Sequence, residues 1–300
     1  MQKFYSHGKL LITAEYAVLD GAKALAVPTK FGQSLQVKPI ESPEIRWKSF
    51  DHKGALWFET TLQFTTFNTT STNAIAKRLS DCFLAISKLN PNRFKSDTGF
   101  EMRSHLEFPQ HWGLGSSSTL INNLAQWAQV DAFELLKNTF GGSGYDIACA
   151  QHPHPILYER KDGAVKIKAV QFDPTFKDNL FFVHRNQKQN SREAIAAYNA
   201  LKTTKKLDFS ELNAITESIL QTSTLKDFEA LISQHENLLS KLIQQPTLKR
   251  THFPEYKGVV KSLGAWGGDF FLATGQSDAM QYFRNKSYGT IVPFREMVKS

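Results

Sequence analysis

A glycine- and serine-rich segment near the middle of the chain offers the first residues that could do chemistry. Residues 113–119 read Gly-Leu-Gly-Ser-Ser-Ser-Thr and lead from an extended stretch, residues 101–111, into an expected helix over residues 120–129. Glycine tolerates positive φ and close approach to a ligand, and a helix N-terminus presents N–H groups and a positive dipole end. The segment therefore fits a phosphate cradle, although a serine-rich turn with a helix cap has the same composition.

Two ionisable residues elsewhere in the sequence could serve phosphoryl transfer. That reaction needs a phosphate cradle, a divalent cation, neutralisation of the transferred charge and a group that orients or deprotonates the acceptor. Lys9 could supply the positive charge, although a lysine at a strand end is an ordinary feature. Asp146 lies among small and apolar residues, where burial raises a carboxyl pKa and a nearby cation lowers it. It could act as a base beside Lys9, and a helix N-cap is the alternative role.

A second glycine-rich segment lies near the end of the sequence. Residues 264–269 read Gly-Ala-Trp-Gly-Gly-Asp and offer either a concave set of backbone N–H groups or a tight turn. The standard nucleotide motifs are missing from the sequence: it has no P-loop, no complete dinucleotide-binding glycine motif and no protein-kinase motif set. Any phosphate chemistry therefore depends on the two glycine-rich segments together with Lys9 and Asp146.

The elements that must position these residues mix strands and helices without regular βαβ alternation. This pattern predicts an α+β fold with largely antiparallel strands, including a meander of three strands over residues 45–49, 56–59 and 62–67. Residues 258–263 fit either the end of a helix or a strand. The other expected strands cover residues 3–6, 10–13, 24–27, 34–39, 100–106, 155–160, 164–171, 180–184 and 270–274, and the other helices cover 72–89, 131–137, 192–201, 210–221 and 225–242.

Composition and charge narrow the class of protein. The 300 residues are 41% hydrophobic, enough for two intimate domains, and Phe172-Asp173-Pro174 marks the expected boundary between residues 1–172 and 173–300. The net charge of +8 is dispersed, with no basic run or nucleic-acid-binding module, so we expect no nucleic-acid partner. Cys82 and Cys149 give neither a disulfide framework nor a zinc-ligand spacing. Without a leader-like or membrane-spanning apolar run, we expect a cytoplasmic protein with no membrane partner.

Three segments, in order, resemble the motifs of the GHMP kinases, the superfamily of galactokinase, homoserine kinase, mevalonate kinase and phosphomevalonate kinase. Residues 8–21, Gly-Lys-Leu-Leu-Ile-Thr-Ala-Glu-Tyr-Ala-Val-Leu-Asp-Gly, are similar to the first motif, residues 113–119 to the second and residues 261–269 to the third. Tyr16 after Glu15, the segment 142–148 around Asp146, and Asp269 closing the third motif are most similar to phosphomevalonate kinases and next to mevalonate kinases.

The resemblance implies a two-domain fold with an ATP-binding domain over residues 1–172, an α+β domain over residues 173–300, and the active site between them. It also implies ATP and Mg²⁺ as cofactors, and phosphorylation of a small anionic acceptor, phosphomevalonate or mevalonate. Carried over by position, Lys9 and Asp146 are the catalytic pair, and Ser117 is the metal ligand. The residues implied for cofactor binding are Gly113, Leu114, Gly115, Ser116, Ser117, Ser118, Thr119, Gly264, Gly267 and Gly268.

Several positions depart from the resemblance. Ala14 and Trp266 stand where the family usually has glycine, and His111-Trp112 replaces small residues before the second motif. These departures support an alternative, a catalytically silent small-molecule-binding or sensor protein on the same fold. The sequence leaves open whether the protein is a monomer or a homodimer. The open candidates are Lys3, Arg185 and Lys188 for the acceptor's anionic group, and Glu15 and Asp269 for the Mg²⁺ carboxylate.

Overall fold

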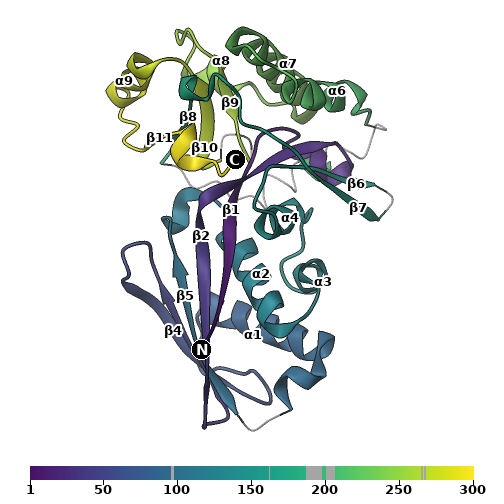
Figure 1. Cartoon of the computed structure of the whole chain (residues 1–300), viewed down its shortest axis with the longest axis vertical. Helices are drawn as coiled ribbons and strands as arrows, with labels where there is room; N and C mark the ends of the chain where they lie inside the picture. Colours follow the sequence, from purple (N-terminus) through teal and green to yellow (C-terminus); the bar gives the residue numbers. More distant parts are fainter. Residues whose placement is uncertain (96–97, 162, 187–197, 201–206, 265, 267) are drawn as a thin grey trace. The chain divides into compact units, whose positions relative to one another are not determined.

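The chain divides into two compact units, and Figure 1 labels helices and strands of both where there is room, without labels for β3 (Glu44–Phe50) and α10 (Phe294–Met297). The mixture of elements confirms the expected α+β class. The predicted boundary between residues 172 and 173 falls within unit 2, and the division into an ATP-binding and a second domain stays a prediction. The computed structural model describes residues 1–95, 98–161, 163–186, 198–200, 207–264, 266 and 268–300. Unit 1 consists of Met1–Gly8, Phe31–Gln110 and Leu114–Gln151, and unit 2 of Lys9–Lys30, His111–Gly113 and His152–Ser300.

Unit 1 contains a sheet in the strand order β4-β3-β5-β2. β3 (Glu44–Phe50) and β4 (Leu56–Gln63) form an antiparallel hairpin, and β5 (Gly99–Leu106) runs antiparallel to β2 (Ala24–Ile40) but parallel to β3. The third strand of the expected meander is wrong, because residues 62–63 continue β4 and a turn follows. Parallel neighbours need a crossover connection, which the chain between β3 and β5 provides through a helix.

The helices of unit 1 cover one side of this sheet, as Figure 1 shows for α1 (Ala74–Leu89), α2 (Ser116–Ala128) and α3 (Ala132–Lys137). α1 begins where the side chain of Asn73 accepts a hydrogen bond of 2.8 Å from the Ile75 N–H, as a helix N-cap does. Helix and strand residues share one apolar core. α2 also packs against α4 (Tyr145–Gln151), the helix that carries Asp146.

Unit 2 contains a four-stranded antiparallel sheet in the order β11-β8-β10-β9. All residues of β8 (Leu180–His184) and β10 (Phe270–Thr274) are buried, as expected for central strands covered on both faces. Residues 258–263, for which helix and strand were both open, contain the strand β9 (Val260–Ser262). The remaining strands are β11 (Ile291–Pro293) and the hairpin of β6 (Ile156–Lys161) and β7 (Ala164–Ala169), in which β6 pairs with the first residues of β2.

The longest helix of unit 2 is α7 (Leu225–Ile243), which packs against α6 (Ser210–Ile219). Its N-cap is Thr224, whose hydroxyl accepts a 3.1 Å hydrogen bond from the Asp227 N–H. The buried face of α7 is apolar except for His235 and Glu236. Buried polar groups need hydrogen-bond partners, so these two residues indicate a local polar network.

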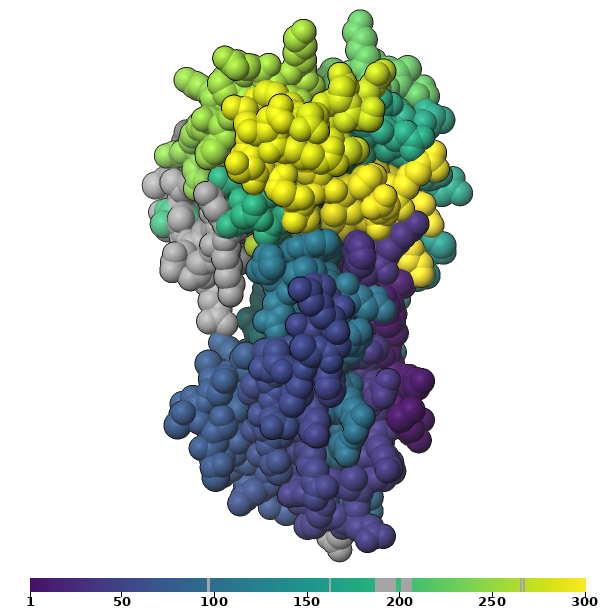
Figure 2. Space-filling model, turned by 90° about the vertical axis from the view of Figure 1, so that its left-hand side faces the viewer, coloured from purple at the N-terminus to yellow at the C-terminus, as the bar shows by residue number. Residues whose placement is uncertain are grey.

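Near the end of the chain, one helix of unit 2 lies at the surface. α9 (Ser277–Asn285) buries only Phe283, and it belongs to the yellow region of Figure 2. α8 (Leu248–His252) and α10 (Phe294–Met297) are two further short helices of this unit.

In the described part of the chain, no helix combines the length and the apolar character that crossing a membrane requires. The helix expected over residues 192–201 lies largely outside the described residues.

Candidate active site

The glycine- and serine-rich segment of residues 113–119 leads into α2 through two glycines in the left-handed backbone conformation. Gly113 has φ 64° and Gly115 has φ 89°, a left-handed conformation that glycine adopts with less strain than other residues. α2 begins at Ser116, earlier than the expected position 120, with Gly115 as its N-cap. Because glycine offers no capping side chain, the N–H groups of the first turn are left for an anionic ligand.

The four hydroxyl groups of this segment divide into two pairs. Ser118 and Thr119 are buried, and their hydroxyls donate to the Gly115 carbonyl at 2.8 and 3.0 Å. The Thr119 hydroxyl also lies 2.6 Å from Gln33 Oε1. Ser116 is half-buried and Ser117 is exposed. Ser118 and Thr119 therefore hold the loop in shape, whereas Ser116 and Ser117 present their hydroxyls at the helix start; Leu114 is buried and serves the core.

Lys9 and Asp269 both meet Gly113. Lys9, on β1 (Gln2–Leu11), donates from Nζ to the Gly113 carbonyl at 2.9 Å. A Cβ added to Gly113 would lie 1.6 Å from Asp269 Oδ2, so the carboxylate occupies the space that any other residue would need. Gly113 thus contacts a lysine through its carbonyl and a carboxylate at its Cα, and it is held both in a left-handed backbone conformation and by this close approach.

Gly113→Ala is expected to lower the free energy of unfolding by about 2 kcal/mol or more, since strain at positive φ and overpacking each contribute about 1–3 kcal/mol. Asp269→Gly in the same background removes the overlap and should recover part of the loss. Urea unfolding of the two variants checks this expectation. A Gly113→Ala variant as stable as the wild type, or no recovery in the double variant, would contradict the packing of Asp269 on Gly113.

Two histidines lie close enough to Asp269 to affect the pKa of its carboxyl. Burial raises the pKa of Asp269, while Lys9, His184 and His111 act to lower that pKa. His184, at the end of β8, lies opposite Phe270 in the β8–β10 pairing, and its Nε2 is 3.1 Å from the carbonyl oxygen of His111. The Trp112 ring packs edge-on against Phe270 at a centroid distance of 5.4 Å. His111-Trp112 is therefore packed against the ends of β8 and β10, beside Asp269.

Asp146 lies at the start of a helix in unit 1. It is half-buried in the first turn of α4, and its Oδ1 is 3.1 Å from the Ile147 N–H. Asn122 of α2 donates to the Ala150 carbonyl at 3.4 Å and so links α2 to α4. Lys9 belongs to unit 2, and the pairing of Lys9 with Asp146 stays a prediction.

The candidates for anion and metal binding have different surroundings. Lys3 is exposed on β1, Lys188 lies outside the described residues, and Arg185 donates its backbone N–H to the Asp269 carbonyl at 2.8 Å. The backbone of Arg185 therefore lies next to Asp269, whereas its guanidinium lies 3.4 Å from His252 Nε2. Glu15 is fully buried, and its Oε1 lies 2.6 Å from Lys261 Nζ, so this carboxylate already has a structural partner.

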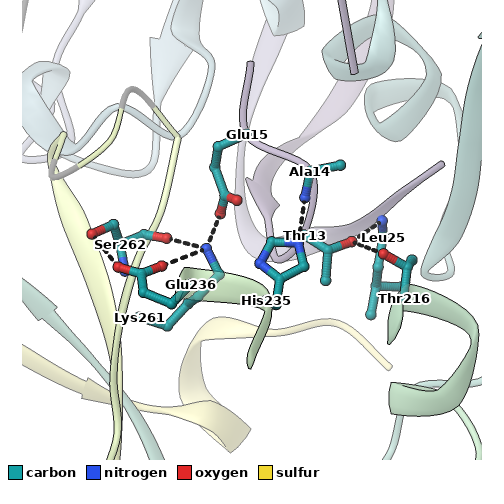
Figure 3. A network of polar contacts seen from close by, with 9 residues as sticks. All are labelled: Thr13, Ala14, Glu15, Leu25, Thr216, His235, Glu236, Lys261 and Ser262. Atoms are coloured by element: carbon teal, nitrogen blue, oxygen red, sulfur yellow. Dashed lines mark hydrogen bonds and ion pairs between the residues drawn. The ribbon is translucent and has the colours of Figure 1, made fainter. Parts of the chain in front are cut away.

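A buried polar network around Lys261 was not predicted from the sequence. Its Nζ donates to Glu15 Oε1 and to the Ser262 carbonyl, both at 2.6 Å, and lies 3.2 Å from Glu236 Oε2 (Figure 3). Figure 3 also shows His235 beside these residues, next to Ala14. The available sequence signal was a lysine inside the apolar stretch 259–263, because a charge in such a strand requires a partner.

The Glu15 carboxyl predicts a distinct pH dependence of stability. Burial raises the pKa of Glu15 to about 7 against the opposing effect of Lys261, so its folded pKa exceeds the ordinary value of 4.5. Such a group contributes stability that is present below pH 4.5 and is lost as the pH rises through 7. Glu15→Gln should therefore gain stability over the wild type between pH 5 and pH 8, by on the order of 3 kcal/mol. Urea unfolding across this range checks it, and a pH-independent difference would contradict it.

The backbone N–H groups and hydroxyls of this site suit a nucleotide bound together with its Mg²⁺. They suit a metal ion held by protein side chains alone less well. Among the described residues, no group of three or more histidine, cysteine, aspartate or glutamate side chains is arranged to hold an ion. Mg²⁺ bound with a nucleotide keeps water and phosphate oxygens and needs few protein ligands. The uncapped N–H groups of α2 fit the phosphates, and the exposed hydroxyl of Ser117 fits Mg²⁺.

The sequence of this chain and its structure give different results when each is compared with known proteins. Searches of the sequence find no matching family model and no matching curated protein. Solved structures match over nearly the whole chain. Galactokinase from Lactococcus lactis, complexed with galactose, has a TM-score of 0.73 at 15% identity, covering 100% of this chain and 94% of that chain. Phosphomevalonate kinase from Streptococcus pneumoniae, with phosphomevalonate and AMPPNP, has a TM-score of 0.68 at 17% identity, covering 95% and 96%. The L. major mevalonate kinase with R-mevalonate has a TM-score of 0.65 at 17% identity, covering 97% and 94%.

The chain has the fold of the GHMP kinases. This confirms the fold that the three sequence motifs implied.

Within this GHMP-kinase fold, two departures from the motifs keep a glycine-like backbone. Ala14 has φ 64° and Trp266 has φ 46°, which is the left-handed region that glycine adopts most easily. Trp266 is buried, and its Nε1 donates to the Pro246 carbonyl at 3.3 Å. Gly264 has φ 62° and Gly268 is buried, whereas Gly267 lies outside the described residues. The two substitutions therefore change side chains and leave the local backbone in the conformation that glycine would take.

Proposed function

We propose that this protein is an ATP-dependent small-molecule kinase of the mevalonate pathway, acting in the cytoplasm on phosphomevalonate or mevalonate. The observation that carries the proposal is the contact of Lys9 Nζ with the Gly113 carbonyl, at the start of the glycine–serine segment that leads into α2. A charged amine at a phosphate-cradling loop is an arrangement that phosphoryl transfer uses. The GHMP-kinase fold supports the same class, since its solved neighbours include sugar and isoprenoid kinases.

In this proposal, the chain's own residues take separate roles. The first-turn N–H groups of α2 and the glycines at 264, 267 and 268 hold the nucleotide, and Ser117 ligates Mg²⁺. Lys9 balances negative charge that develops on the transferred group. Asp146 accepts the proton of a hydroxyl acceptor, or orients a phosphate acceptor. ATP supplies the γ-phosphoryl group, and Mg²⁺ neutralises charge on its oxygens.

The acceptor's anionic group is proposed to bind near Arg185. This residue follows His184 in the chain and joins Asp269 through its backbone. Burial lowers the pKa of the Arg185 guanidinium, and a group so placed gains from an anionic ligand. Two of the solved neighbours are complexes with R-mevalonate and with phosphomevalonate, which supports such an acceptor for this chain.

A coupled assay of ADP release, with mevalonate, phosphomevalonate and galactose as acceptors, tests this function. We expect turnover with one of the first two and a much lower rate with galactose. The second candidate is a catalytically silent binding protein, which the side chains at Ala14 and Trp266 favour. ATP binding without turnover on any acceptor would favour that candidate and exclude the kinase.

A further inference from the structure

Two adjacent residues of α7 bind the backbones of two separate motif segments (Figure 3). His235 Nε2 accepts a hydrogen bond of 2.9 Å from the Ala14 N–H. Glu236 Oε1 accepts one of 3.0 Å from the Ser262 N–H and another of 2.7 Å from the Ser262 hydroxyl. One dipeptide of α7 therefore contacts the first motif at Ala14 and the start of the third motif at Ser262.

Lys261 joins these two contacts into one network. Its ammonium group binds Glu15 Oε1 at 2.6 Å and lies 3.2 Å from Glu236 Oε2. The side chains of Lys261 and Glu15 are 0% exposed and that of Glu236 is 4% exposed, so water does not screen their charges. A displacement of either motif segment would leave buried charged groups without their partners. The network therefore strongly opposes such a displacement.

The protonation state of His235 allows its imidazole to accept a hydrogen bond. Burial and the charge of Lys261 lower the pKa of His235 well below 6.5, so the imidazole is neutral and Nε2 can accept. Among the described residues, His235 Nδ1 has no hydrogen-bond partner. A buried ring with one unsatisfied nitrogen is a poor choice for packing alone, because an apolar side chain would avoid that desolvation penalty. The bond to Ala14 is the role that accounts for a histidine here.

The two segments held in this way carry the proposed active-site residues. Ala14 follows Lys9 along the first motif, and Ser262 precedes Gly264 and Asp269 in the third. We propose that His235 and Glu236 are positioning residues of the kinase: they fix both motif segments to α7 and so fix where Lys9 and Asp269 meet the loop at Gly113. This inference rests on the proposed function, and it concerns the placement of the reacting groups rather than contact with the substrate.

Three variants separate positioning from general stability. His235→Leu removes the acceptor, His235→Gln keeps an acceptor oxygen at a similar reach, and Thr216→Val is the matched control. Thr216 donates its buried hydroxyl to Thr13 at 3.1 Å, so the control also removes a buried hydrogen bond next to Ala14. We expect His235→Leu to lower kcat by about tenfold or more with a smaller change in KM for ATP, His235→Gln to retain most of kcat, and Thr216→Val to match the wild type.

Hydrogen exchange at the Ala14 amide gives a readout that needs no turnover. We expect exchange there to be at least about tenfold faster in His235→Leu than in the wild type, and close to wild type in His235→Gln and Thr216→Val. Unchanged exchange in His235→Leu, or equal loss of kcat in all three variants, would overturn the positioning role. A wild-type protein without kinase turnover but with the expected exchange pattern would refute the proposed function while leaving the His235–Ala14 contact supported.

Discussion

Asp146→Asn is expected to lower kcat with a hydroxyl acceptor by about 10²- to 10⁴-fold, because the amide cannot take the acceptor's proton. ATP affinity should stay nearly unchanged, since the nucleotide is proposed to bind the loop before α2 rather than this carboxylate. A phosphate acceptor is already ionised, so the loss with phosphomevalonate should be smaller than with mevalonate. Steady-state kinetics and displacement of a fluorescent nucleotide measure the two effects separately.

Asp131→Asn is the matched control for this change. Asp131 caps α3, in the same unit, by accepting from the Phe133 and Glu134 N–H groups at 2.7 and 2.9 Å. Asparagine caps helices about as well as aspartate, so this control removes one acidic charge from a helix start and should leave turnover unchanged. Turnover of Asp146→Asn within about twofold of the wild type would show that Asp146 only begins α4 and would refute its role as a base.

Lys261→Met is expected to lower the free energy of unfolding by about 3–5 kcal/mol, because it leaves the buried Glu15 and Glu236 carboxyls without their shared cation. The triple variant with Glu15→Gln and Glu236→Gln carries no buried charge in this network. It should therefore be more stable than Lys261→Met alone. Urea unfolding at a pH above 7, where ionisation of Glu15 is favoured, gives the largest difference between these two variants.

The exposed pair of Arg103 and Glu101 provides the control for Lys261. Their side chains lie 2.7 Å apart with Arg103 53% exposed, and an ion pair in water contributes only about 0–1 kcal/mol. Arg103→Met should thus change stability little. A Lys261→Met variant as stable as Arg103→Met would show that the buried network is not required for the fold. A triple variant less stable than Lys261→Met would show that the carboxylates are stabilised by more than Lys261.

Local sequence signals predicted much of the secondary structure but not its connections. The helix expected over residues 225–242 is α7, because a capping threonine precedes a long amphipathic pattern. The strands expected over residues 24–27 and 34–39 are instead one continuous strand, β2. Pro28 and Gly32 both lie within this strand, although proline and glycine are unfavourable in strand interiors. The parallel pairing of β3 with β5 also left no trace in the sequence, since both orientations give the same alternation.

The candidate site shows the same division between local and distant signals. The left-handed glycines before α2 follow from their residue types, and the turn was predicted on that basis. The pairing of Lys261 with Glu15 joins residues 246 positions apart, so it could not be read from either segment. Asp269 was considered as the acid that closes the third motif and as a metal ligand, whereas its contact with Gly113 depends on its place directly before β10. The catalytic roles of Lys9 and Asp146, and the metal role of Ser117, stay predictions.

The most direct test of the account is transfer of the terminal phosphoryl group of ATP to a small acceptor. The wild-type protein is incubated with Mg²⁺, ATP labelled at the γ-phosphate, and either mevalonate or phosphomevalonate, and the acceptor is then isolated. We predict that the label moves to the acceptor, only when Mg²⁺ is present, and that Lys9→Met and Asp146→Asn suppress the transfer. Label that stays on ATP with both acceptors, although the nucleotide binds, or that appears only as inorganic phosphate, would contradict the proposed kinase.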